Sequence, residues 1–182
     1  MAKKKKKDDD NSPLGDGGKT LLLVRHAKSS WADFEQKDFD RPLNDRGKKD
    51  APAMAKRIRK EKDIKLDAII SSPANRAFET AKYFAKEFDI KKKRIIQISE
   101  LYEPTIEAFY NAVTDLDDDY KNVALFSHNP GITAFVNQLT NVHIDDMPTC
   151  SIFAVYILHD EWKNFRTADK EFWFFDYPKN LK

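Results

Sequence analysis

Residues 20–26, Thr20-Leu21-Leu22-Leu23-Val24-Arg25-His26, decide the fold class. The short run of Leu and Val predicts a β-strand that is covered on both faces of a sheet. Further strands are expected at 66–70, 94–98, 123–126, 150–158 and 171–176. Helical spacing of apolar residues predicts helices at 44–60, 74–88, 106–116 and 132–139. Strands that alternate with helices predict an α/β fold, a three-layer sandwich with a mostly parallel central sheet flanked by helices.

The whole chain has the size and composition of one globular domain, with 182 residues, 41% hydrophobic and 34% charged. Its formal net charge of +2 gives no reason to expect nucleic acid or a membrane as a partner. Residues 1–18 carry a lysine block and an aspartate block that cannot bury apolar surface, so we expect a disordered charged tail there and a single domain at 19–182. No stretch resembles a signal peptide or a bilayer span. The single cysteine, Cys150, excludes an intrachain disulfide and favours a reducing compartment, the cytoplasm.

Reactive side chains follow three of the predicted strands. Arg25 and His26 end the first strand, Arg76 begins the helix after the second, and His128 follows the fourth. Ligands of such sheets bind at the carboxyl ends of the strands. We therefore expect these four residues to converge in one pocket that can carry positive charge.

Such a pocket suits a phosphoryl group. The arginine guanidinium is a planar fork of donors that matches phosphate oxygens. A neutral imidazole can attack phosphorus and form a covalent intermediate, which water then hydrolyses. The arginines supply the charge neutralisation that a metal ion could otherwise provide, so we expect neither a metal nor another cofactor.

Three blocks of sequence resemble the signature of the histidine phosphatase superfamily, which includes phosphoglycerate mutases, acid phosphatases and small protein phosphohistidine phosphatases. The blocks are 22–27 (LLVRHA), 71–81 (SSPANRAFETA) and 127–131 (SHNPG). The resemblance implies a phosphoglycerate mutase-like fold. It also implies that His26 is the phosphorylated nucleophile, that Arg25 and Arg76 bind phosphate, and that His128 is the second catalytic histidine and a further phosphate ligand.

Three other stretches resemble the SixA-like group of phosphohistidine phosphatases within this superfamily. They are 25–31 (RHAKSSW), 41–47 (RPLNDRG) and 148–151 (PTCS). Arg41, in the second of these, either lines the mouth of the pocket or pairs with Asp40 or Asp45.

The general acid that would protonate the leaving group is assigned from the resemblance alone. Mutase-like members place a carboxylate after the third strand, which makes Glu103 the candidate here and Glu100 the second choice. An imidazole leaving group can be protonated without much help, so a phosphohistidine substrate does not require a dedicated acid.

The resemblance and the short chain together predict a phosphatase that acts on phosphohistidine of a signalling phosphoprotein, such as a phosphotransfer domain. Few residues remain to form a lid, and an open pocket suits a side chain on a protein better than a small phosphorylated molecule. The stretch 31–41 could nevertheless fold over the pocket. The alternatives are a small-molecule phosphomonoester phosphatase or mutase on the same scaffold and, in a different class, a non-catalytic phosphate-binding module.

Overall fold

Six strands form one mixed sheet in this computed structural model, which describes residues 18–33 and 35–180. Their order is β3-β2-β4-β1-β5-β6, and their bounds are β1 Lys19–Arg25, β2 Ala68–Ser71, β3 Ile96–Gln97, β4 Asn122–Ser127, β5 Ile152–Ile157 and β6 Lys170–Asp176. The strands β3, β2, β4 and β1 are parallel, whereas β5 is antiparallel to both of its neighbours. The mostly parallel sheet is therefore confirmed. The predicted tail, apart from Gly18, lies outside the described residues.

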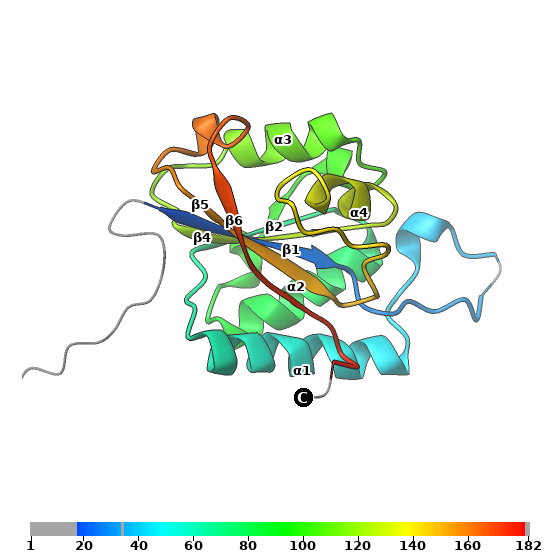
Figure 1. Cartoon of the computed structure of the whole chain (residues 1–182). Coiled ribbons are helices and arrows are strands. Elements are labelled where there is room, and N and C mark those ends of the chain that lie inside the picture. The colour runs from blue at the N-terminus through cyan, green and yellow to red at the C-terminus, as the bar shows by residue number, and fades with distance from the viewer. Residues whose placement is uncertain (1–17, 34, 181–182) are drawn as a thin grey trace, which may run out of the picture.

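Helices cover both faces of the sheet (Figure 1). The described α-helices are α1 Asp45–Lys62, α2 Asn75–Glu87, α3 Ile106–Thr114 and α4 Gly131–Val136. The described chain also contains short 3-10 helices, which are η1 Asp38–Asp40, η2 Lys92–Arg94, η3 Ser99–Leu101 and η4 Trp162–Asn164. The pair α1 and α2 lies on one face, and the pair α3 and α4 lies on the other. The predicted three-layer sandwich is thus confirmed. None of the described helices is both long enough and apolar enough to cross a bilayer.

The central strand β1 is buried on both faces, as its composition predicted. Leu22 and Val24 belong to the core cluster that includes residues of α1 and α2. Leu21 and Leu23 belong to the opposite cluster, with residues of α3 and α4. Because successive side chains of a strand point to opposite faces, one run of Leu and Val contributes to both layers of the core. The end of this strand is therefore held rigidly in the middle of the molecule.

The third predicted strand, 94–98, is too long. Only Ile96–Gln97 pairs with β2, and Arg94 is the last residue of η2. Both strand residues are exposed at the edge of the sheet, whereas Ile95 is buried in the core. An edge strand has one neighbour and little to pack against, so the β-propensity of this stretch is not sufficient to extend it.

Helix α1 begins where the sequence predicted. The side chain of Asn44 accepts a hydrogen bond from the backbone N–H of Gly47 at 2.9 Å, which is an N-cap interaction. Pro52 lies inside the helix, which continues unbroken to Lys62.

Gly47 packs so closely against the chain that follows β1 that no side chain fits. A Cβ at this position would collide with the backbone carbonyl of Lys28. We expect Gly47→Ala to destabilise the fold by about 1–3 kcal/mol, because backbone must move to accommodate the methyl group. Thermal denaturation should show the melting temperature falling by several degrees, at about 2–4 °C per kcal/mol. The neighbouring variant Lys48→Ala, at an exposed position, is the control, and equal melting temperatures for the two variants would contradict the packing argument.

Candidate active site

The carboxyl ends of three adjacent strands bring three of the predicted site residues together. His26 follows β1, His128 follows β4, and Arg76 lies in the first turn of α2 after β2. Arg76 Nε lies 3.3 Å from His26 Nε2 and donates to it, and the two histidine rings have centroids 5.0 Å apart. All three residues are buried. They form one cluster at the edge of the sheet where the sequence predicted it.

The backbone of His26 is anchored from two sides. Its N–H donates to the carbonyl of Ser127 at 3.1 Å, next to the end of β4. Its carbonyl accepts from the N–H of Cys150 at 3.0 Å, just before β5. Cys150 adopts a left-handed backbone conformation, with φ 63°, at this point. The nucleophile candidate therefore sits on backbone that belongs to the centre of the sheet.

The ring of His26 is fixed in the neutral form that a nucleophile needs. Nδ1 lies 2.8 Å from the carbonyl oxygen of Ala27, and because a carbonyl can only accept, Nδ1 carries the proton. Nε2 therefore presents its lone pair toward Arg76. Burial, aided by the positive charge of Arg76, lowers the pKa of His26 to about 3. At neutral pH the ring is uncharged, and its unprotonated Nε2 accepts the hydrogen bond from Arg76 Nε.

His128 is also neutral and has one unused polar atom. Its Nε2 lies 2.8 Å from Ser72 Oγ, and this hydroxyl also accepts from the N–H of Ala74. Burial, together with the nearby His26, lowers the pKa of His128 to about 2. Nδ1 is buried and has no hydrogen-bond partner among the described residues. When the Ser72 hydroxyl donates to Nε2, the ring proton of His128 is on Nδ1 and lacks an acceptor.

Arg25 holds a second unused donor. Its Nη1 donates to the carbonyl of Met147 at 2.5 Å and lies 3.4 Å from a carboxylate oxygen of Asp146. Its Nε is buried and has no partner within the described part of the chain. A buried donor without an acceptor costs free energy. The orphaned atoms of Arg25 and His128 therefore favour an acceptor that arrives with a ligand.

Asp38 joins two arginines and was not singled out from the sequence. Its carboxylate accepts from Arg76 Nη2 at 2.9 Å, from Arg41 Nη1 at 2.8 Å and from the Tyr102 hydroxyl at 2.8 Å. Burial opposes its ionisation, but these three hydrogen bonds outweigh burial and lower the pKa of Asp38 to about 2. Its backbone carbonyl accepts a further bond from Arg76 Nη1. Asp38 therefore holds Arg76 in place as a permanent anion.

Of the two alternatives for Arg41, pairing with Asp40 or Asp45 is wrong, because its ion pair is with Asp38. Arg41 also donates to Ser29 Oγ and stacks on the ring of Trp31, with its guanidinium carbon 3.3 Å from the ring centroid. The i, i+3 spacing of Asp38 and Arg41 was the one sequence signal that could have revealed the pair. The stretch 31–41 thus does reach the site, through Asp38.

A cavity of about 480 Å³ opens from this cluster. Asp38, Arg76, Tyr102 and Glu103 are among its lining residues. Glu103 is exposed, and no hydrogen bond joins it to His26 or His128 within residues 18–33 and 35–180. Glu103 therefore shares the cavity with Arg76 without a hydrogen bond to either histidine among these residues, and its role as a general acid stays a prediction. Glu100 does not line the cavity.

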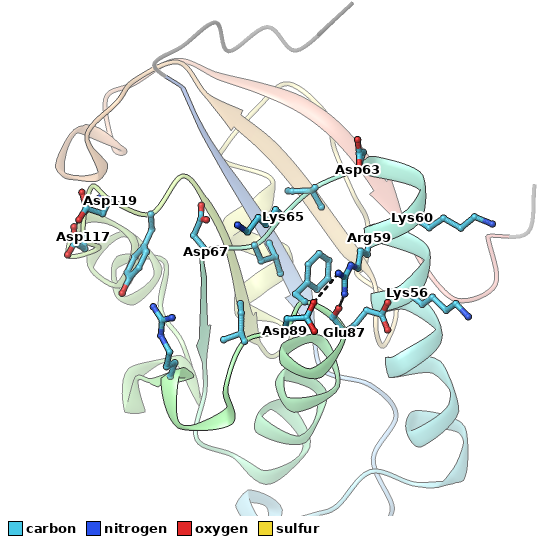
Figure 2. A pocket seen from close by; sticks show the side chains of 16 residues that line it. Lys56, Arg59, Lys60, Asp63, Lys65, Asp67, Glu87, Asp89, Asp117 and Asp119 are labelled. Carbon is cyan, nitrogen blue, oxygen red and sulfur yellow. Dashed lines mark hydrogen bonds and ion pairs between the residues drawn. The ribbon is translucent and has the colours of Figure 1, made fainter. Parts of the chain in front are cut away.

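Figure 2 shows a larger cavity, of about 1110 Å³, with a different character. It lies between the last turns of α1 and α2 and the residues that precede β2 and β4, at the opposite end of the sheet. Side chains of both signs line it, and Arg59 forms an ion pair with Asp89 there. None of the described residues that line it is a histidine or a predicted phosphate ligand. Size alone therefore does not identify the site in this protein.

One group of possible metal ligands is present in the described chain, at His159, Asp160 and Glu161, with ligand atoms within 4.8 Å of one another. The group follows β5 and lies at the end of the sheet away from His26, because Ile157 pairs with Lys19. Both ring nitrogens of His159 already have hydrogen-bond partners, and Glu161 pairs with Lys163. The group does not bear on the histidine cluster.

The low pKa values of the two histidines predict how the site responds to pH. An exposed histidine protonates near 6.5, whereas the pKa is lowered to about 3 for His26 and to about 2 for His128. We expect the ring NMR signals of both residues to stay constant from about pH 8 to about pH 5. Because the unfolded chain binds these protons and the folded chain does not, the free energy of unfolding should fall as the pH drops below about 6.5. A titration midpoint near 6.5 for either ring would contradict the neutral site.

A neutral buried histidine beside an arginine, at the carboxyl ends of parallel strands, is an arrangement that suits the transfer of a phosphoryl group through histidine. The family model described as the histidine phosphatase superfamily (branch 1) matches residues 21–108, a range that contains His26, Arg76 and Glu103. The chain is thus similar to the histidine phosphatase superfamily over a range that spans just under half of its length.

Known proteins are similar to this chain in sequence and in fold. An uncharacterized chloroplastic protein of Arabidopsis thaliana is 28% identical over 160 residues, which are 84% of this chain and 72% of that protein. Phosphoserine phosphatase 1 of Hydrogenobacter thermophilus is 40% identical over 83 residues, 43% of this chain and 38% of that one. The structure of the protein histidine phosphatase SixA complexed with tungstate superimposes with a TM-score of 0.75 at 19% identity, over 90% of this chain and 99% of that chain. The SixA-like architecture predicted from the motifs is confirmed.

Proposed function

We propose that the protein removes the phosphoryl group from phosphohistidine on a partner protein, through a phosphohistidine formed on His26. One observation carries the proposal. The lone pair of neutral His26 lies near two buried nitrogens that have no hydrogen-bond partner among the described residues, Arg25 Nε and His128 Nδ1. A phosphoryl group placed against His26 Nε2 would supply the missing acceptor oxygens, and Arg76 is within reach of the same oxygens.

In the first step His26 Nε2 attacks phosphorus in line with the bond to the leaving nitrogen. The Nε2–P bond forms, the substrate P–N bond breaks, and its electron pair goes to the leaving imidazole. When the distal nitrogen of that imidazole is protonated, the ring departs neutral and needs no further proton. His26 has the same arrangement, because its Nδ1–H is held by the Ala27 carbonyl. The step therefore exchanges one phosphorylated imidazole for an equivalent one.

In the second step water attacks phosphorus. The new O–P bond forms, the P–Nε2 bond breaks, and its electron pair returns to His26 as the lone pair of Nε2. The protons of the water are retained by the phosphate product and the solvent. Arg25 and Arg76 neutralise the phosphoryl oxygens in both steps, in a buried setting where such interactions are strong.

A phosphohistidine on a protein is supported by the form of the site and by the SixA-like stretches. His26 is buried, so the substrate must extend a side chain inward to reach it, through a cavity of about 480 Å³. The named activity of the SixA relative supports the same substrate. We further propose a reducing compartment, the cytoplasm, because the one cysteine is buried and free.

A small phosphomonoester is the second candidate substrate. It is favoured by the similarity of 83 residues of the chain, at 40% identity, to phosphoserine phosphatase 1 of Hydrogenobacter thermophilus. An enzyme for such a substrate would need to protonate an alkoxide leaving group, and Glu103 is the carboxylate in the cavity that could do so.

The test compares turnover of a protein-borne phosphohistidine, phosphoserine and a sugar phosphate under the same conditions. We expect phosphohistidine to have the highest kcat/KM and radiolabelled phosphate to be trapped on His26 after a rapid alkaline quench. Preference for phosphoserine or the sugar phosphate would overturn the substrate assignment. Tight phosphate binding without turnover of any of the three would instead indicate a binding module.

A further inference from the structure

The site cavity is lined by two carboxylates and one guanidinium, a formal excess of one negative charge. Asp38 and Glu103 both line it, and Arg76 is the one cation among the lining residues. The other lining residues are uncharged and include Tyr102 and Pro130. This composition contrasts with the cluster around His26, which is positive.

The reaction geometry assigns this cavity to the leaving group. Displacement at phosphorus is in line, so the leaving atom lies on the side of phosphorus away from His26 Nε2. Arg76 connects the two regions, since its Nε contacts His26 and its side chain also lines the cavity. Tyr102 makes a second connection, with its ring centroid 5.7 Å from that of His128. A group that departs from phosphorus therefore enters the acidic cavity.

The charge on Asp38 is fixed both in position and in ionisation. Three hydrogen bonds hold its carboxylate, from Arg41, Arg76 and Tyr102. These bonds keep its pKa near 2, so it is ionised whenever the enzyme is folded and near neutral pH. Glu103 adds a second carboxylate that is exposed and free of any such anchor among the described residues.

We propose that Asp38 and Glu103 select substrates by the charge of the leaving group, accepting neutral or cationic groups and rejecting those that carry a carboxylate or a second phosphate. The inference rests on the proposed function, because it assumes catalysis at His26. A phosphorylated imidazole with a protonated distal nitrogen carries positive charge toward this cavity, and a phosphorylated hydroxy acid carries negative charge. Each carboxylate attracts the cationic imidazole and repels the anionic hydroxy acid. Each should therefore change the ratio of kcat/KM values for cationic and anionic leaving groups about tenfold.

The test is the kcat/KM for 3-phosphoglycerate divided by the kcat/KM for phenyl phosphate. The leaving group of 3-phosphoglycerate carries a carboxylate, whereas that of phenyl phosphate carries no charged substituent. We expect Asp38→Asn and Glu103→Gln each to raise this ratio about tenfold, and added salt to reduce the difference between each variant and the parent. Asp38 also positions Arg76, so the variant will lose activity toward both substrates, but the ratio cancels that loss. Glu107→Gln, an exposed carboxylate on α3 that does not line the cavity, is the matched control and should leave the ratio unchanged.

An unchanged ratio in both variants would overturn the inference. Failure of the parent to hydrolyse phosphohistidine would overturn the proposed substrate and leave this ratio as an independent result. If the parent turns over neither test compound, calorimetric binding of the same two compounds to His26→Ala, with and without Glu103→Gln, measures the same discrimination. Equal affinity ratios with and without the Glu103 carboxylate would then overturn the inference.

Discussion

His26→Ala is expected to lower kcat/KM by about 10⁴-fold or more, with the fold intact. Loss of a covalent nucleophile removes the two-step route entirely and leaves only the contribution of binding and of the positioned donors. We expect a large effect because the Ala27 carbonyl fixes the ring proton of His26 on Nδ1 and leaves Nε2 unprotonated. Within the described site, His128 has no such bond to a backbone carbonyl. The measurement is steady-state turnover of phosphohistidine, with circular dichroism to check folding.

His143→Ala is the control for this experiment. His143 has an exposed side chain and an ion pair with Asp145, away from the cluster, and its loss should leave kcat/KM within about twofold of the parent. Turnover by His26→Ala at a tenth of the parental rate or more would contradict covalent catalysis at His26. Label on another residue after quenching the parent would contradict it as well.

Arg76→Lys is expected to lower kcat/KM by about 10²- to 10³-fold, although the charge is conserved. The guanidinium contacts His26 through Nε and Asp38 through both Nη atoms, three directions that a single ammonium cannot serve together. The loss should fall on the reaction step, because Arg76 neutralises charge that builds up on the phosphoryl oxygens. Single-turnover measurements would separate phosphoryl transfer from binding.

Arg59→Lys is the matched control for Arg76→Lys. Arg59 is an arginine of the larger cavity, paired with Asp89, and this cavity lies at the opposite end of the sheet from the histidine cluster. We expect its replacement to leave kcat/KM unchanged. Equal losses in the two variants, or full activity of Arg76→Lys, would contradict the assignment of Arg76 to the phosphoryl group.

The sequence predicted those parts of the site that are attached to regular structure. His26, Arg76 and His128 each follow a strand of strongly apolar composition, and parallel strand ends must meet at one edge of the sheet. Asp38 was missed because it lies in a stretch without helical or strand periodicity, and nothing in its local sequence indicates that its partners are a distant arginine and Tyr102. For Glu103, the sequence predicted a position close to the site, and Glu103 does line the same cavity as Arg76. The sequence did not predict that this carboxylate would lack a hydrogen bond to either histidine among the described residues. Side chains on irregular segments are placed by tertiary contacts, which no local pattern encodes.

The edge strand β3 shows that the extent of a strand, like the position of a loop side chain, depends on tertiary contacts that the local sequence does not encode. Its sequence has the composition of a buried strand, yet only Ile96–Gln97 pairs with the sheet. Burial depends on what lies on either side, and β3 has no further strand beyond it. Central strands such as β1, which are covered on every side, leave no such ambiguity.

The anchoring of His26 differs from that of Asp38 in a way that bears on how such enzymes diversify. His26 is bonded through its backbone to residues beside β4 and β5, so its place is set by the central sheet. Asp38 belongs to the connection from β1 to α1, whose described parts extend away from the sheet in Figure 1. Insertions and replacements in that connection can reshape one wall of the pocket while the sheet that carries the nucleophile stays as it is. The backbone position of His26 and the shape of this wall are thus set by different parts of the chain, and Asp38 links the two through its bonds to Arg76.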